Sequence, residues 1–109
     1  MDKNKFTAFI GSMFNDSISI YCKPKNLTVN SIQRTYNKKS RLNFTLIQNE
    51  VTISTNGTQV QDEGYIVLLH VNNFTADDFG NYTLNISNSI GSSEWNFVLE
   101  AHSKYVFTF

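Results

Sequence analysis

The stretch DDFGNYTLNIS, residues 77–87, decides the fold class because it joins a turn to a β-strand. Asp78 and Gly80 are residue types that favour a turn, since an aspartate side chain can cap it and glycine tolerates positive φ angles. Apolar and polar residues then alternate strictly. The apolar positions are Tyr82, Leu84 and Ile86, and the polar positions are Asn81, Thr83 and Asn85. A period of two predicts a strand with one buried face, so this stretch predicts a turn that leads into a half-buried strand.

The same period-two pattern recurs along the chain, and helical periodicity is nearly absent. A first strand is expected within residues 1–14, followed by strands at 17–22, 31–36, 43–47, 51–55, 65–71, 81–87 and 94–101. The Asn56-Gly57 pair between two of these segments favours a tight hairpin turn. Short strands at this spacing are typical of an antiparallel sandwich. We therefore predict one all-β domain of seven to nine strands over residues 1–109, in which about 103–109 end the last strand or begin a linker.

Three segments resemble an immunoglobulin-superfamily domain of the V or I set. NDSISIYC (15–22) resembles strand B with the family's first cysteine, LHVNNFTADDFGNYT (69–83) resembles strand E and the E–F corner, and NSIGSSEWNFVLEA (88–101) resembles the F–G hairpin and strand G. The resemblance implies an immunoglobulin-like antiparallel β-sandwich with Greek-key connections and a tyrosine corner, in which the Tyr82 hydroxyl bonds to upstream backbone. The inward positions that it implies near this corner are Leu69, Val71 and Phe74. It also leaves residues 37–64 for strands C′ and D.

The chain departs from the family pattern at two core positions. The second cysteine is replaced by Leu84, so the disulfide between strands B and F cannot form with Cys22, which we expect to be a small buried hydrophobe. Strand C has Arg34 near the position of the family's core tryptophan. Arg34 is expected to pair, to reach the edge of the sandwich, or to yield its place to Tyr36. Trp95, inward on strand G by alternation, would supply the missing aromatic volume.

Composition and charge argue against several classes of function. The net charge is formally zero, so no overall field attracts nucleic acid or an anionic membrane. Residues 1–41 hold eight of the nine basic residues, and the rest hold seven of the nine acidic ones, so the halves either pair on folding or form complementary faces. The chain has two histidines, His70 and His102, on different segments, and one cysteine, and these residues have no metal-ligand spacing and form no nucleophile motif. We expect His70 to be a surface residue. We expect no enzyme, no metal site and no cofactor.

The number of N-glycosylation sequons indicates the cellular compartment in which the protein is made. The chain has 14 asparagines, and seven of them begin N-x-S/T sequons, more than the roughly three expected by chance. The sequon asparagines are Asn15, Asn26, Asn43, Asn56, Asn73, Asn81 and Asn85. A codon bias toward asparagine is the alternative, but it does not place the serine or threonine. The sequons therefore favour a glycosylated extracellular domain.

Two candidate interaction surfaces follow from the strand pattern. The first is the outer face of strands C and F, with the basic segment after strand C; its residues are Gln33, Thr35, Asn37, Lys38 and Lys39, beside the outward Asn81, Thr83 and Asn85. Glycans on both Asn81 and Asn85 would obstruct flat pairing there. The second is the outer face of strand E, where Ile66 and Leu68 point away from the core or are covered by another segment.

The resemblance implies a recognition or adhesion module of a cell-surface receptor, on the extracellular face of the membrane or secreted, with a protein partner that can be a second copy. Cysteine-poor, asparagine-rich domains of this kind resemble invertebrate self/non-self recognition receptors, such as the allorecognition proteins of colonial cnidarians. The alternatives are a domain of a secreted immune-defence protein beside a lectin-like module, and a viral immunoglobulin-like decoy. Membrane contact is expected only through segments outside residues 1–109, where a signal peptide and any anchor would lie.

Overall fold

The computed structural model describes residues 4–22, 26–36 and 40–101. Within these ranges the chain forms seven β-strands and one short 3-10 helix, η1, before the sixth strand. The strands are β1 (Lys5–Ala8), β2 (Phe14–Ile20), β3 (Thr28–Arg34), β4 (Asn43–Thr55), β5 (Thr58–Val71), β6 (Gly80–Asn88) and β7 (Gly91–Ala101), and η1 is Ala76–Asp78. The predicted strand at 94–101 is correct, and residues 103–109 lie outside the described residues.

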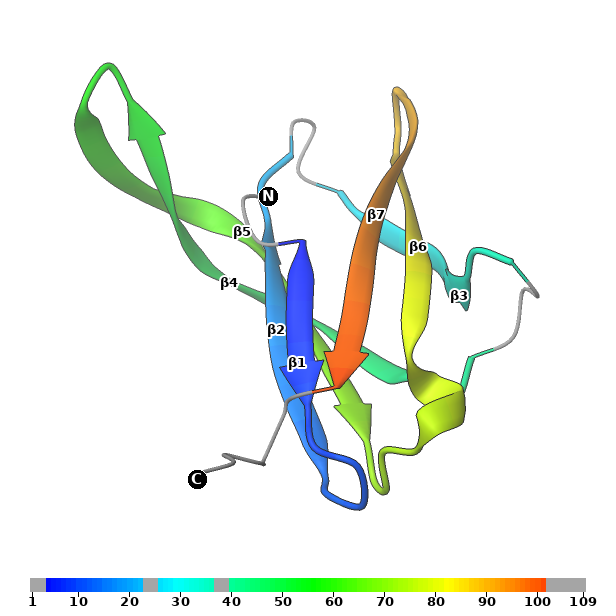
Figure 1. The fold of residues 1–109 in the computed structure, drawn as a ribbon. Coiled ribbons are helices and arrows are strands. Elements are labelled where there is room, and N and C mark those ends of the chain that lie inside the picture. The colour runs from blue at the N-terminus through cyan, green and yellow to red at the C-terminus, as the bar shows by residue number, and fades with distance from the viewer. Residues whose placement is uncertain (1–3, 23–25, 37–39, 102–109) are drawn as a thin grey trace, which may run out of the picture.

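The strands form two sheets that pack face to face (Figure 1). One sheet has the order β1-β7-β6-β3 and the other the order β2-β5-β4. Neighbouring strands are antiparallel except β1 and β7, which run parallel. The chain changes sheet between β1 and β2, between β2 and β3, between β3 and β4, and between β5 and β6, as Greek-key connections do. The prediction of an all-β sandwich of seven to nine strands is confirmed, with seven strands in the described residues, and the fold is consistent with an immunoglobulin-like domain.

Side chains from both sheets form one apolar core. Its buried members are Phe6, Ala8, Phe14, Ile18, Ile20, Ile32, Leu42, Val67, Leu69, Val71, Phe74, Tyr82, Leu84, Ile86, Phe97 and Leu99. The predicted inward positions of strands β5 and β6 are all among them. Leu84, in the place of the family's second cysteine, is fully buried and lies opposite Ile32 on β3 and Trp95 on β7. Apolar packing therefore occupies the position where the resemblance would place a disulfide.

Phe97, not Trp95, is the central aromatic residue of the core. Its ring lies 5.6 Å from Phe6, 5.4 Å from Tyr82 and 5.5 Å from Trp95, measured between centroids. Trp95 faces inward, as its alternation predicted, but it is only half-buried and packs on the edge of the core. The missing core tryptophan is thus replaced by several rings around one phenylalanine, with Tyr82 and Trp95 stacked on Phe97 and Phe6 edge-on to it.

The corner before β6 has the predicted geometry. The Tyr82 hydroxyl donates a hydrogen bond to the Asp78 carbonyl oxygen over 2.8 Å, and Gly80 has a φ angle of 129°. The Asp78 carboxylate is almost fully buried and caps the turn by accepting from the Thr75 backbone N–H at 2.8 Å. Arg41 Nη1 donates to the same carboxylate oxygen at 2.9 Å. Burial raises the pKa of the Tyr82 hydroxyl above its ordinary value of 10.0, and the charge of Arg34 opposes the rise.

Arg34 reaches the edge of the sandwich, one of the outcomes expected for it. Its guanidinium donates to the carbonyl oxygens of Asp77 and Phe79, the latter at 2.8 Å. Ile32 occupies the core position on β3, and Tyr36 is 95% exposed, so the alternative that Tyr36 replaces Arg34 in the core is wrong. The charged end of Arg34 is thus hydrogen-bonded to backbone oxygens of the corner, as a partly buried guanidinium requires.

The segment between β3 and β5 differs from the expectation. Two short strands at 43–47 and 51–55 were expected; the structure instead has one 13-residue strand, β4, paired with β5 along its whole length. Among the described residues between β3 and β4 there is no strand. The Asn56-Gly57 turn has φ angles of 50° and 77°, the left-handed values that the hairpin prediction required. The resulting long hairpin curves away from the rest of the sandwich (Figure 1).

Candidate recognition surfaces

The first candidate surface is the outer face of β3, β6 and β7, where side-chain hydrogen bonds cross three strands. Thr83 lies between Gln33 on β3 and Asn96 on β7 in the strand register. The Thr83 hydroxyl donates to Asn96 Oδ1 at 3.0 Å and lies 3.0 Å from the Thr35 hydroxyl. We call seven polar residues on this side of the sheet the polar face: Asn30, Gln33, Thr35, Thr83, Asn85, Glu94 and Asn96.

A second cross-strand chain of hydrogen bonds holds Asn85. Its Oδ1 accepts from Asn30 Nδ2 at 2.8 Å, and its Nδ2 donates to Glu94 Oε1 at 3.5 Å. Asn85 is half-buried, whereas the other six sequon asparagines are exposed. The sequence prediction found Asn85 but missed Asn30, Glu94 and Asn96. Alternation along β7 together with the F–G hairpin register could have placed Glu94 and Asn96 opposite β6.

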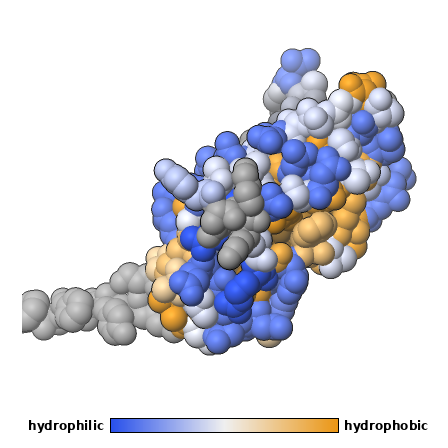
Figure 2. Space-filling view, turned by 90° about the vertical axis from the view of Figure 1, so that its right-hand side faces the viewer, coloured by the Kyte–Doolittle hydropathy of each residue, from blue (hydrophilic) through white to orange (hydrophobic). Residues whose placement is uncertain are grey.

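The structure brings Gln33 and Thr35 together with Thr83, as the first candidate surface requires. Asn37, Lys38 and Lys39 lie outside the described residues, so the basic part of this surface stays a prediction. Figure 2 views the side of the molecule on which β3 lies. It shows hydrophilic residues over much of that side and apolar residues gathered in a hollow beside them.

The second candidate surface is the outer face of β2, β5 and β4, which we call the Leu68 face. It consists of three rows across the strands: Asn15, His70 and Asn43; Ser17, Leu68 and Thr45; and Ser19, Ile66 and Ile47. Leu68 is 42% exposed and Ile47 37% exposed, while Ile66 is half-buried. No described strand packs on this face, since β1 pairs with β7 of the other sheet.

His70 lies at one end of the Leu68 face between two asparagines. Its Nδ1 is 2.6 Å from Asn15 Oδ1, and its Nε2 is 2.5 Å from Asn72 Oδ1. His70 faces away from the core, as predicted, although it is half-buried. Its contacts fix the Asn15 amide in place, so this histidine orders a sequon side chain.

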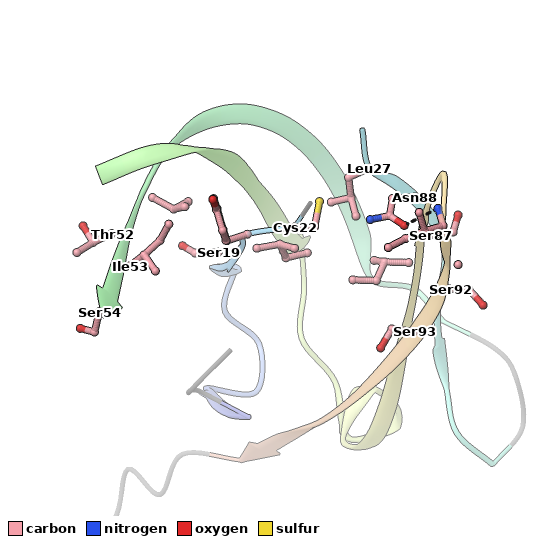
Figure 3. Close-up of a pocket in the computed structure, with 16 residues that line it drawn as sticks. Ser19, Cys22, Leu27, Thr52, Ile53, Ser54, Ser87, Asn88, Ser92 and Ser93 are labelled. Atoms are coloured by element: carbon pink, nitrogen blue, oxygen red, sulfur yellow. Dashed lines mark hydrogen bonds between the residues drawn. The ribbon is translucent and has the colours of Figure 1, made fainter. Parts of the chain in front are cut away.

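A third surface is a cavity of about 820 Å³ between the β4–β5 hairpin and the β6–β7 hairpin. Figure 3 shows Thr52, Ile53 and Ser54 on one side, Ser87, Asn88, Ser92 and Ser93 on the other, and Ser19 and Cys22 between them. Its lining also includes the buried aliphatic residues Ile20, Val51 and Ile86. None of its described lining residues carries a formal charge at neutral pH. Such a lining suits a neutral, partly apolar ligand or simply solvent.

Cys22 lines this cavity, which corrects the expectation that it is buried in the core. Strand β2 ends at Ile20, whose partner is Tyr65, and Cys22 follows the strand as a half-buried residue with a free thiol. Beyond Tyr65 the strand β5 pairs only with β4, so the described part of the chain offers β2 no further partner for continuing to Cys22.

Among the described residues, Lys5–Glu100 and Arg41–Asp78 are ion pairs that join the basic and acidic halves of the sequence. Lys5 Nζ lies 3.6 Å from Glu100 Oε1, and Arg41 pairs with Asp78. These pairs favour the alternative in which the halves join on folding. Across residues 4–22, 26–36 and 40–101, no group of three or more His, Cys, Asp or Glu residues is placed to hold a metal ion. The same part of the chain has no helix long and apolar enough to cross a bilayer.

No protein-family model matches this chain, and no curated protein sequence matches it.

Proposed function

We propose that this chain is an extracellular immunoglobulin-like module that acts in cell-surface recognition or adhesion and binds a protein partner through its polar face. Homophilic binding, in which a second copy is the partner, is the first form to test. It is also what the resemblance to invertebrate self/non-self receptors leads us to expect.

The observation that carries the proposal is the position of the sequons on the sandwich. Six of the seven sequon asparagines are exposed, and they lie on strands of both sheets, on the β4–β5 turn and on loops. An N-glycan at any of these six positions would extend into solvent without disturbing the core. This arrangement supports an environment in which N-glycans are added, namely the secretory pathway and the cell exterior.

The polar face is the best-supported contact surface on this module. Its hydrogen-bonded side chains already hold defined positions across three strands, so a partner would not have to order them on binding. On β3, β6 and β7, Asn81 is the exposed sequon asparagine and lies at the start of β6. Asn85 lies in the middle of the face with both amide atoms hydrogen-bonded, and we expect it to remain unmodified.

The test begins with the full chain secreted from eukaryotic cells behind a secretion signal. Peptide mass spectrometry after enzymatic deglycosylation in ¹⁸O water reports the occupancy of each sequon. Removal of a glycan converts its asparagine to an aspartate that contains ¹⁸O, so the mass of the peptide shows which asparagines carried a glycan. Analytical ultracentrifugation and aggregation of protein-coated beads then measure self-association. We expect occupied exposed sequons, an unoccupied Asn85 and concentration-dependent association.

Two results would contradict different parts of this proposal. A secreted protein with no occupied sequon would refute the glycosylated extracellular module. A glycosylated protein that stays monomeric at all concentrations and does not aggregate beads would refute homophilic recognition, leaving only a heterophilic partner.

A further inference from the structure

We infer that N-glycans on Asn15 and Asn43 pack their first sugar over Leu68, so that the Leu68 face is covered by the chain's own glycans and is not a docking surface. This inference rests on the proposed extracellular function, because it needs both sequons to be occupied. It assigns a stabilising role to two of the seven sequons.

The strand register places both sequons beside the same apolar residue. Asn15 on β2 and Asn43 on β4 both lie opposite His70, two residues from Leu68 on β5. They are therefore the diagonal neighbours of Leu68, with Cα atoms about 7 Å away. Each asparagine is exposed on the same side of the sheet as Leu68.

The row through Leu68 leaves room for a sugar on both sides of it. Its direct cross-strand neighbours are Ser17 and Thr45, whose side chains are short, so Leu68 on the central strand remains 42% exposed. Ser17 and Thr45 are also the hydroxyl residues of the two sequons, Asn15-Asp16-Ser17 and Asn43-Phe44-Thr45. The sequence requirement for the glycan and the space beside Leu68 are thus met by the same two residues.

The Asn15 amide is oriented in a way that allows attachment. Its Oδ1 contacts His70 Nδ1 at 2.6 Å, which leaves Nδ2, the atom that carries an N-linked sugar, for the glycan. Asn85 provides the contrast, because its Nδ2 donates to Glu94 across the polar face. An N-acetylglucosamine ring has an apolar C–H surface, and removal of that surface and of Leu68 from water stabilises the folded state.

The test compares thermal unfolding of variants made in two hosts. In the glycosylated protein we expect N15Q/N43Q to lower Tm by about 4 °C or more. The matched pair N26Q/N73Q also removes two glycans, from the loop before β3 and from the loop before η1, and should leave Tm nearly unchanged. In unglycosylated protein from bacteria N15Q/N43Q should have a much smaller effect, which controls for loss of the contact between Asn15 and His70.

A third variant locates the effect at Leu68. In the Leu68→Ser background the Tm difference caused by N15Q/N43Q should largely disappear, and in the unchanged protein nuclear Overhauser contacts should join the Leu68 methyl groups to sugar ring protons. If N15Q/N43Q and N26Q/N73Q lower Tm equally while the sequons are occupied, the inference is wrong and the proposed function stands. If no sequon is occupied, both are wrong.

Discussion

At the residue scale, the corner before β6 shows which contacts a sequence can predict. The bond from Tyr82 to the Asp78 backbone and the cap by Asp78 are local, within four residues, so the spacing of DDFGNYT predicts them. Arg41 lies 37 residues from Asp78, and no local pattern points to it. The ion pair nevertheless matters for the corner, because it supplies the charge partner that a buried carboxylate requires.

The substitution Tyr82→Phe tests the corner. It removes the hydroxyl that donates to the buried Asp78 carbonyl oxygen, so we expect the free energy of unfolding to fall by about 1 kcal/mol. Urea unfolding at pH 7 measures the change. Tyr36→Phe is the matched control, because Tyr36 is 95% exposed, and it should leave the urea midpoint unchanged.

The same variant tests the raised pKa of Tyr82. Burial holds the pKa of Tyr82 in the folded state above 10.0, its ordinary value in the unfolded chain. Between the unfolded-state and the folded-state pKa the unfolded chain has already lost the proton, so the stability of the folded protein falls as the pH rises. The stabilisation is fully present below pH 10 and is lost progressively above it. In the Tyr82→Phe variant this part of the alkaline loss should be absent; equal pH profiles for the two proteins would contradict it.

At the scale of elements, the long β4–β5 hairpin was predicted only in part. The Asn56-Gly57 pair predicted the turn, and the apolar alternation predicted strands on both sides. The polar stretch between Ile47 and Val51 interrupts that alternation, so the sequence suggested two short strands where one is present. Backbone pairing with β5 continues through the polar stretch, and this pairing does not depend on side-chain pattern. The backbone pairing of β4 with β5 therefore determines the length of the strand, in spite of the interrupted alternation at residues 48–50.

Gly64 allows the hairpin to pack against the end of β2. A Cβ atom at this position would lie 2.6 Å from Val51 Cγ2 and 2.7 Å from the Ile20 carbonyl oxygen. We expect Gly64→Ala to lower the free energy of unfolding by about 2 kcal/mol, because a backbone atom cannot move aside as a side chain can. Gly91→Ala is the control, since nothing lies within 4 Å of its added Cβ, and urea unfolding of both variants should separate them. A Gly64→Ala protein as stable as Gly91→Ala would show that this packing is not needed.

At the scale of the whole molecule, the two sheets present outer faces of different chemistry. The Leu68 face has sequons on both outer strands and an apolar centre, whereas the polar face carries hydrogen-bonded amides and hydroxyls. Alternation predicted which residues of each strand point outward, including Ile66, Leu68, Gln33 and Thr83. It could not predict which strands lie side by side, because strand order depends on contacts between distant segments. The roles of Asn30, Glu94 and Asn96 therefore became visible only in the folded chain.

The difference between the faces predicts where a single new charge will block recognition. Asn96→Arg places a cation in the polar face, removes the acceptor of the Thr83 hydroxyl and leaves every sequon intact. We expect it to weaken self-association in the ultracentrifuge roughly tenfold or more, because an unpaired charge at the contact is costly to desolvate. Ile47→Arg adds the same charge on the Leu68 face, also without touching a sequon, and should leave association unchanged. Both side chains are exposed in the folded protein, so Tm should show that each variant remains folded. Loss of association in Ile47→Arg but not in Asn96→Arg would place the contact on the opposite sheet and would also argue against a glycan-covered Leu68 face.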